Sequence, residues 1–311
     1  MPTLLISHPA SLGHLVPEGH PERPDRMRAI DRALEAEEFQ SLLREVAPLA
    51  PIDAALLAHP EDYVRAIEAA APGEGEDLVG VDADTVMSSG SLEAVMRGVG
   101  AAMLAVDEVV AGNVSNAFCC TRPPGHHAER RRAMGFCIFN QAAIAAIHAQ
   151  KAHGLKRVAV MDFDVHHGNG TQDIFWNHED LFYASTHQMP LYPGTGAARE
   201  TGAAGNIVNA PLAPGSGGRE FREAMEGIVL PALDEFSPEL LIISAGFDAH
   251  RRDPLASLNF VEEDFAWGTR KLMEVADRSC GGRVVSVLEG GYDLMGLALS
   301  TAAHVRTLMT R

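Results

Sequence analysis

Two carboxylates and one imidazole stand at alternating positions where a buried strand is expected to end. These residues are Asp162, Asp164 and His166, and they follow residues 157–161, a short apolar run rich in valine. Side chains alternate between the faces of a strand, so an extended backbone would point all three the same way. Groups of this kind repel or desolvate one another unless a cation lies among them. The spacing therefore predicts a metal site.

A further carboxylate follows a second strand-like run. Asp248 comes shortly after residues 239–245, and with Asp164 and His166 it would supply one nitrogen and two carboxylate ligands. Three protein ligands with an open position are typical of catalytic zinc, because a water molecule and a substrate oxygen can then bind. Oxygen-rich ligation weakens the preference for zinc, so Fe²⁺ and Co²⁺ are alternative occupants.

Two other motifs add groups that could transfer or donate a proton. A stiff Pro-Pro-Gly turn precedes His126 and His127 and could fix both rings toward the metal. Histidine is the usual acid or base near neutral pH, although paired loop histidines are often surface residues. Tyr292 follows two glycines, which allow close approach of the backbone. Its phenol could donate a hydrogen bond to a developing oxyanion, or it could be an amphipathic rim residue.

The segments that must position these residues alternate between strand-like and helical patterns. Strands are expected at 3–7, 116–121, 157–163, 181–186, 239–245 and 283–289. Helices are expected at 24–38, 91–111, 140–153, 219–236, 261–278 and 296–310. Such alternation predicts an α/β fold with a mainly parallel sheet covered by helices on both faces.

Boundary signals and loops refine this scheme. Ser91 suits the N-cap of the helix that follows it, and Gly112 is placed to end that helix. The loop-like stretches 69–77 and 211–218 do not resemble domain linkers. A single domain over residues 1–311 is therefore expected.

The residues that could bind a metal or transfer a proton follow the ends of four expected strands. In open α/β sheets, ligands bind beyond the carboxyl ends of the strands. The four strands and the residues after them are 116–121 with His126 and His127, 157–163 with Asp164 and His166, 239–245 with Asp248, and 283–289 with Tyr292. This convergence predicts one site at one edge of the sheet.

Composition narrows the class of protein. The 311 residues are 46% hydrophobic and can bury a sizeable core. The net charge of −17 argues against nucleic acid as a partner, since phosphate binding needs a basic face. It suits a cationic substrate such as an amine or a lysine-rich peptide, or a simple solvated acidic surface. No apolar run is long enough to cross a membrane, and no signal-peptide pattern is evident. The cysteines lack C-x-x-C spacing and are expected to be buried reduced thiols of a cytoplasmic protein.

Motifs along nearly the whole chain resemble the zinc-dependent histone deacetylase family of the arginase-deacetylase superfamily. They are GHPERPDR at 19–26, RPPGHH at 122–127, GFCIFN at 135–140, DFDVHHGNG at 162–170, YPGTG at 192–196, SAGFD at 244–248 and EGGY at 289–292. The relatives include bacterial acetylpolyamine amidohydrolases and acetoin-utilisation proteins. The resemblance implies one catalytic domain with the arginase-deacetylase fold, a sheet of about eight strands and hydrolysis of a linear amide C–N bond.

The resemblance also implies roles at the reaction centre. It makes Asp164, His166 and Asp248 the zinc ligands. His127 becomes the general base and acid, with His126 beside it as an electrostatic partner.

Other positions take supporting roles by the same resemblance. Tyr292 and the metal would polarise the amide carbonyl while an activated water attacks it, which releases acetate and a free amine. Asp162 would orient His126, and Arg26 would assist acetate release. The implied substrate-binding positions are Gly135, Phe136, Tyr192, Leu255, Gly290 and Asp84. A structural K⁺ would be held by backbone oxygens of Asp162, Asp164 and His166, with Ser185 and Thr186.

Three positions bear on the subtype within the family. Asn169 stands where one branch has an Asp bound to the second catalytic histidine, and Asn is typical of the class II-like branch. A neutral amide stabilises an imidazolium less than a carboxylate does, so His127 is expected to be less basic. Tyr292 predicts activity on acetyl-lysine, because some class II members have His there. Leu255 is not the acidic residue of a polyamine-selective member, which favours acyl-lysine.

Several alternatives stay open. The protein could be an acetylpolyamine deacetylase, or a catalytically silent acyl-lysine-binding module, although a binder has no need of all of His126, His127 and Tyr292. An arginase-type binuclear manganese centre would need further ligands. The glycine-rich stretches 194–196 and 201–206 lack the features of a phosphate-binding loop. The expected partner is an acylated lysine peptide or protein or an acetylated amine, with no nucleic acid, no membrane and homo-oligomer formation left open.

Overall fold

An eight-stranded parallel sheet forms the centre of the computed structural model, which describes residues 2–310. The strand order is β2-β1-β5-β10-β9-β6-β7-β8, and every neighbouring pair is parallel. The strands are β1 Thr3–Ser7, β2 Leu43–Val46, β5 Asn116–Cys120, β6 Val158–Asp162, β7 Leu181–Gln188, β8 Ile207–Leu212, β9 Leu240–Ala245 and β10 Val284–Leu288. A separate antiparallel pair consists of β3 Val79–Gly80 and β4 Val86–Met87. The expected parallel sheet of about eight strands is confirmed.

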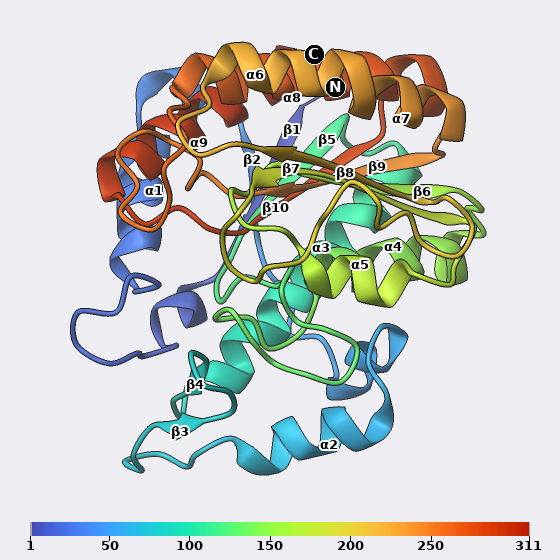
Figure 1. Ribbon diagram of the computed structural model, residues 1–311. Helices are drawn as coiled ribbons and strands as arrows, with labels where there is room; N and C mark the ends of the chain where they lie inside the picture. Colours follow the sequence, from blue (N-terminus) through green and yellow to red (C-terminus); the bar gives the residue numbers. More distant parts are fainter. Residues whose placement is uncertain (1, 311) are drawn as a thin grey trace.

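Helices cover both faces of the sheet. They are α1 Asp25–Leu34, α2 Glu61–Ala70, α3 Ser91–Ala111, α4 Gln141–His153, α5 Asn169–Phe175, α6 Gly218–Ala224, α7 Leu230–Phe236, α8 Glu262–Cys280 and α9 Leu294–Leu308. Figure 1 shows α3, α4 and α5 on one face and α6, α7, α8 and α9 on the other. Two layers of helices bury both faces, which explains why the strands read as continuous apolar runs.

Alternate residues of each inner strand contribute their side chains to two separate hydrophobic cores, one on each face of the sheet. In β6, Val158 and Val160 belong to the core beneath α3 and α4, whereas Ala159 and Met161 belong to the core beneath α8 and α9. This division follows from the two-residue period of a strand. The four cysteines are buried and have free thiols, as expected.

The edge strands differ from the sequence expectation. All four residues of β2 are exposed, so this strand carries no apolar run that could reveal it. The other edge strand, β8, contains Asn209 and Pro211 and ends at Leu212, so the loop expected at 211–218 begins later. Proline is tolerated at a sheet edge, because one side of the strand needs no ladder partner. Helix α2 was not expected either.

Two helix details also differ. Ser91 is the first residue of α3 and Gly90 is the N-cap, so the expected cap at Ser91 is wrong. The hydroxyl of Ser91 accepts a hydrogen bond from the backbone N–H of Ser88 at 2.7 Å and so binds the preceding turn. Gly112 ends α3 with φ of +75°, as expected. The helix expected at 219–236 is interrupted by a π-helical segment, Met225–Val229, between α6 and α7.

No helix among residues 2–310 has the length and apolar character needed to cross a membrane.

Candidate metal centre and its surroundings

Three potential ligands converge beyond the carboxyl ends of two neighbouring strands. Asp164 and His166 follow β6, and Asp248 follows β9. The Nδ1 atom of His166 lies 3.2 Å from Oδ1 of Asp164 and 3.0 Å from Oδ2 of Asp248. One ligand atom from each residue lies within 4.8 Å of the other two. The structure thus brings together the trio expected from the sequence.

Backbone groups hold the two carboxylates of this trio. The N–H of Gly290 donates to Asp164 Oδ2 at 2.8 Å, and the N–H of Val165 donates to Asp248 Oδ1 at 2.8 Å. Glycine is required around them, since a Cβ on Gly246 would lie 1.9 Å from Asp164 Oδ2. A Cβ on Gly290 would lie 2.3 Å from Asp248 Oδ2. The backbone therefore fixes the carboxylates before any ligand binds.

The charges of the trio suit a divalent cation. Burial opposes a charge on His166, but hydrogen bonds and charges of Asp164 and Asp248 outweigh it and raise the pKa of His166 to about 10. Burial, together with the charge of Asp164, raises the pKa of Asp248 to about 7. Without a cation, only the imidazole rings of His126 and His166 balance the charge of Asp164, and Asp248 tends to keep its proton. Two carboxylates and one imidazole are also ligands that zinc accepts.

Asp162 does not join the other two residues of its motif. Strand β6 ends at Asp162, and its Oδ1 accepts the backbone N–H of Asp164 at 3.1 Å. Its Oδ2 lies 2.9 Å from Nδ1 of His126 and accepts the hydroxyl of Tyr183 at 3.1 Å. The expectation that Asp162, Asp164 and His166 share one direction is wrong, because the extended backbone ends where the turn begins.

His126 is surrounded by negative charge. Its Nε2 lies 3.8 Å from Asp164 Oδ2, on the side opposite the contact with Asp162. Burial disfavours the charged ring, but the charges of Asp162, Asp164 and Glu289 together hold the pKa of His126 well above its usual value. A positively charged His126 next to the trio follows from this arrangement.

His127 differs from His126 in that its hydrogen-bond partner is neutral. Its Nδ1 lies 2.8 Å from Oδ1 of Asn169, and the ring centroids of His126 and His127 are 4.1 Å apart. Burial, and then the charges of His126 and His166, hold the pKa of His127 well below its usual value. A Cβ on Gly135 would lie 2.4 Å from the ring of His127. The two adjacent histidines therefore have opposite tendencies to carry a proton.

Aromatic rings surround the trio. Tyr192 packs edge-on against His127, with ring centroids 5.2 Å apart, and Phe136 packs edge-on against Tyr292 at 5.9 Å. Phe136 adopts a φ of +68°, which is rare for a residue with a side chain. The N–H of Gly135 beside it donates to Asp84 Oδ1 at 2.9 Å. These rings form an apolar rim over the polar centre.

Other residues of the expected site lie around this rim. Tyr292 donates its backbone N–H to Asp253 Oδ2 at 2.7 Å, and burial and the charge of Asp248 raise the pKa of its phenol well above the usual value. The backbone N–H of Leu255 donates to the other oxygen of Asp253 at 3.0 Å. The side chain of Leu255 is exposed. The carboxylate of Asp253 therefore connects the backbone at Leu255 with the backbone at Tyr292.

Arg26 lies in a buried network of charges behind Tyr292. It donates to the carbonyls of Gly291 and Glu289 at 2.7 and 2.5 Å, and its guanidinium lies 5.1 Å from the centroid of the Tyr292 ring. It also donates to Glu22 Oε1 at 2.9 Å.

Glu22 and Glu289 have roles that the sequence did not suggest. Glu22 also accepts two hydrogen bonds from Arg122, both at 2.7 Å. The Oε2 of Glu289 accepts the backbone N–H of Gly125 at 2.7 Å and that of His126 at 3.1 Å. Burial raises the pKa of Glu289 to about 7. The signal for Glu289 in the sequence is a carboxylate directly after the mainly apolar strand β10, Val284–Leu288.

Two of the residues expected to hold a monovalent cation, Ser185 and Thr186, lie on the neighbouring strand β7, whereas Asp162, Asp164 and His166 lie at and after the end of β6. The hydroxyl of Ser185 lies 2.9 Å from Nδ1 of His187. The hydroxyl of Thr186 is buried and has no hydrogen-bond partner among residues 2–310. A buried hydroxyl of this kind is costly unless a water molecule or an ion binds it.

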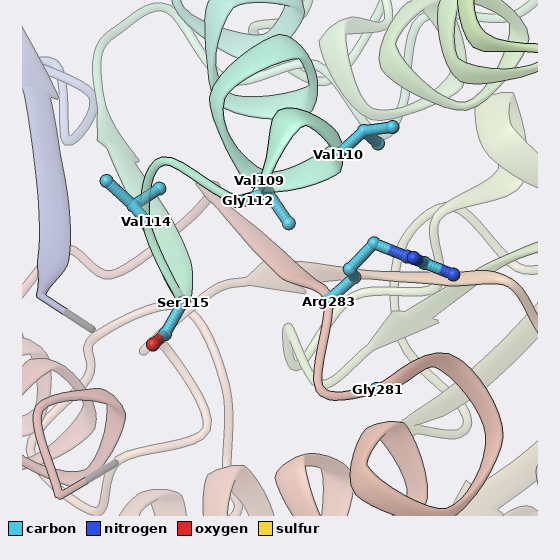
Figure 2. Close-up of a pocket in the computed structure, with 7 residues that line it drawn as sticks. All are labelled: Val109, Val110, Gly112, Val114, Ser115, Gly281 and Arg283. Atoms are coloured by element: carbon cyan, nitrogen blue, oxygen red, sulfur yellow. The ribbon is translucent and has the colours of Figure 1, made fainter.

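A different pocket lies at the opposite ends of the strands. Figure 2 shows it between Val114 and Ser115, which precede β5, and Arg283, which precedes β10. Its volume is about 190 Å³. Since the trio lies beyond the carboxyl ends of the strands, this pocket is separate from the metal centre.

The chain is similar to known proteins over almost its whole length. A family model described as "Histone deacetylase domain" matches residues 20–308. The chain is 40% identical to "Histone deacetylase 14, chloroplastic" of Arabidopsis thaliana, over 98% of this chain and 76% of that protein. It is 40% identical to "Histone deacetylase-like amidohydrolase" of Pseudomonas aeruginosa, over 88% of this chain and 73% of that protein. A solved structure titled "Crystal Structure of HDA15 HD domain" superposes with a TM-score of 0.93 at 36% identity and covers 100% of this chain and 88% of that one.

Proposed function

Because the chain belongs to the histone deacetylase family, which makes it a hydrolase of amide bonds, we propose that it removes acetyl or similar acyl groups from the ε-amine of acyl-lysine. The observation that carries the proposal is the convergence of Asp164, His166 and Asp248 beside His127 and Tyr292. The substrate is an acylated lysine in a peptide or protein.

Zinc is the proposed metal. Asp164, His166 and Asp248 would hold it, and once bound it supplies a Lewis acid that polarises the acyl carbonyl and acidifies a water molecule. Fe²⁺ or Co²⁺ would suit the same ligands. The fixed carboxylates support this assignment, since their backbone partners keep them close together.

Proton transfer is assigned to His127. Its pKa is held low, so the ring is neutral and can accept a proton from the attacking water. The same ring then returns the proton to the leaving amine. His126, kept charged beside Asp162, would stabilise the negative charge that develops in the transition state.

Tyr292 is assigned to the oxyanion. Its raised pKa keeps the phenol protonated, which a hydrogen-bond donor requires. The aromatic rings of Phe136 and Tyr192 would wall the acyl-lysine chain, with Gly135 and Gly290 allowing close approach.

Several further assignments rest on the resemblance. Leu255 and Asp84 would lie at the substrate rim, and Arg26 would assist acetate release. K⁺ would bind backbone oxygens of the β6 turn together with Ser185 and Thr186, and the unpartnered hydroxyl of Thr186 supports this site. One catalytic domain over residues 1–311 is part of the same proposal. A cytoplasmic location stays a prediction, and two plant relatives carry the word chloroplastic in their names.

A substrate comparison tests the proposal. Zinc-reconstituted protein is assayed on acetyl-lysine peptide and on acetylspermidine, with Asp248→Asn as the matched variant that lacks one ligand carboxylate. We expect kcat/KM to be higher on the peptide by roughly tenfold or more, since Leu255 offers no charge to a polyamine. Preference for acetylspermidine would contradict the choice of substrate. Absence of turnover on both would contradict catalysis and leave an acyl-lysine binder.

A further inference from the structure

A second cluster of metal-ligating side chains lies between two helices, away from the strand ends that hold the first. Asp107 is on α3, and His148 and His153 are on α4. One ligand atom from each of the three lies within 4.8 Å of the others. We propose that Asp107, His148 and His153 bind a divalent transition-metal ion, Zn²⁺ or another cation that prefers imidazole, and that this ion joins α3 to α4.

The two rings converge on one oxygen. Oδ1 of Asp107 lies 2.7 Å from Nε2 of His148 and 2.6 Å from Nε2 of His153. The ring centroids are 5.6 Å apart and the rings are nearly perpendicular, at 87°. In tetrahedral zinc sites, neighbouring ligand atoms are about 3.3 Å apart, so each contact needs to open by less than about 1 Å to admit the ion. Rotation of the side chains alone provides such a change.

The backbone positions that create the cluster are well defined. His153 is the last residue of α4, and the chain turns at Gly154 with φ of +70°. His148 lies five positions earlier on the same helix, and Asp107 lies in the last turns of α3. Figure 1 shows α3 and α4 within the same helical layer beneath the sheet. The ligands are thus carried by rigid elements, which favours a preformed site.

Accessibility and charge both suit an ion. The side chains of His148 and His153 are 13% and 24% exposed and that of Asp107 is 46% exposed, so an ion and a water molecule can reach them. Two imidazoles with one carboxylate favour zinc, copper, nickel or cobalt, whereas Mg²⁺ and Ca²⁺ prefer oxygen ligands. The protein's net charge of −17 raises the local concentration of cations.

The competing interpretation is a hydrogen-bonded clamp, in which both rings donate Nε2–H to Asp107. In both interpretations the cluster joins α3 to α4, but only the metal site binds an ion. Copper distinguishes the two sites, because the first trio offers one imidazole and this cluster offers two. A Cu²⁺ spectrum with coupling to two nitrogens is assigned to the second cluster when the signal disappears on replacement of His148 and His153.

The test uses the full chain, dialysed against Zn²⁺ for elemental analysis and loaded with Cu²⁺ for paramagnetic resonance. Wild type is compared with a His148→Gln, His153→Gln double variant and with His178→Gln, a matched change at an exposed histidine. We expect the double variant to bind one zinc ion fewer than wild type and His178→Gln, and to lose the two-nitrogen signal. Equal zinc content, or a wild type without the two-nitrogen signal, would overturn the proposal.

A milder variant covers the case in which the double variant fails to fold. Asp107→Asn keeps an oxygen that accepts hydrogen bonds from both rings but removes the charge that a cation needs. We expect at least about tenfold weaker zinc binding at this cluster with the helices still paired. Unchanged zinc affinity in Asp107→Asn would count against the metal site.

Discussion

Nδ1 of His127 lies 2.8 Å from Oδ1 of Asn169, so a neutral amide holds this ring where a carboxylate could stand. The amide has a fixed orientation, because its Nδ2 donates to Glu129 Oε1 at 2.7 Å. Oδ1 must therefore accept, which places a hydrogen on Nδ1 of His127 and leaves Nε2 free to take up a proton.

Replacing Asn169 by Asp is expected to raise the pKa of His127, since a carboxylate stabilises the imidazolium. The neutral base would then be lost at a higher pH. The acidic limb of the kcat/KM profile should move upward by about one unit. The matched control adds Glu129→Gln, which removes repulsion between the new carboxylate and Glu129. An unmoved limb in both variants would show that His127 is not the titrating base.

Removing the hydroxyl of Tyr292 tests its role as a hydrogen-bond donor. In Tyr292→Phe we expect kcat to fall by about 10²–10³-fold, with KM and metal content little changed. Tyr192→Phe is the matched control, because it removes a phenol from the rim and should lower kcat by less than about tenfold. If both variants keep the wild-type kcat, Tyr292 has no part in oxyanion stabilisation.

The sequence predicted the site better than it predicted the edges of the fold. Asp164, His166 and Asp248 could be placed together because inner parallel strands are long apolar runs whose carboxyl ends meet. The edge strand β2 escaped this argument because all four of its residues are exposed.

The orientation of several side chains depends on tertiary contacts, which the sequence pattern does not show. The Ser91 hydroxyl binds the preceding turn instead of capping α3. The strand period alone pointed Asp162 toward the metal, but the strand ends there and Asp162 contacts His126, the partner that the family resemblance implied. Glu22 is a carboxylate among loop-like residues, and only the fold shows it buried between Arg26 and Arg122.

Glu22 is expected to be central to stability. Burial disfavours its charge, but Arg122 and Arg26 hold the pKa of this carboxyl well below its usual range. Glu22→Gln leaves two buried guanidinium groups without a counter-charge and should lower the free energy of unfolding by about 3–5 kcal/mol. Denaturant titration measures the loss. In the control, Glu38→Gln breaks an exposed pair with Arg306 and should cost at most about 1 kcal/mol. Equal losses in the two variants would refute the argument.

His304 is expected to account for part of the loss of stability at low pH. Burial lowers the pKa of His304 to about 3, and the ring contacts the hydroxyls of Thr269 and Ser286 at 2.6 and 2.9 Å. The unfolded state takes up this proton near pH 6.5 and the folded state does not, so stability falls as the pH drops from about 6.5 toward 3. At pH 5 the loss from this group is about 2 kcal/mol.

A His304→Gln variant should lose that share of the pH dependence, because Gln does not titrate. Unfolding titrations at pH 7 and pH 5 give the comparison, with His178→Gln as the exposed control. The idea fails if His304→Gln and His178→Gln show the same drop between the two values.

The central claim is that one divalent ion binds between Asp164, His166 and Asp248 and is needed for turnover. Anomalous diffraction at the zinc edge, recorded from crystals of catalytically active protein, tests it most directly. We expect a peak about 2.0–2.2 Å from one ligand atom of each residue, and loss of both peak and turnover after chelation. Fully active protein with no peak at this position would contradict the account.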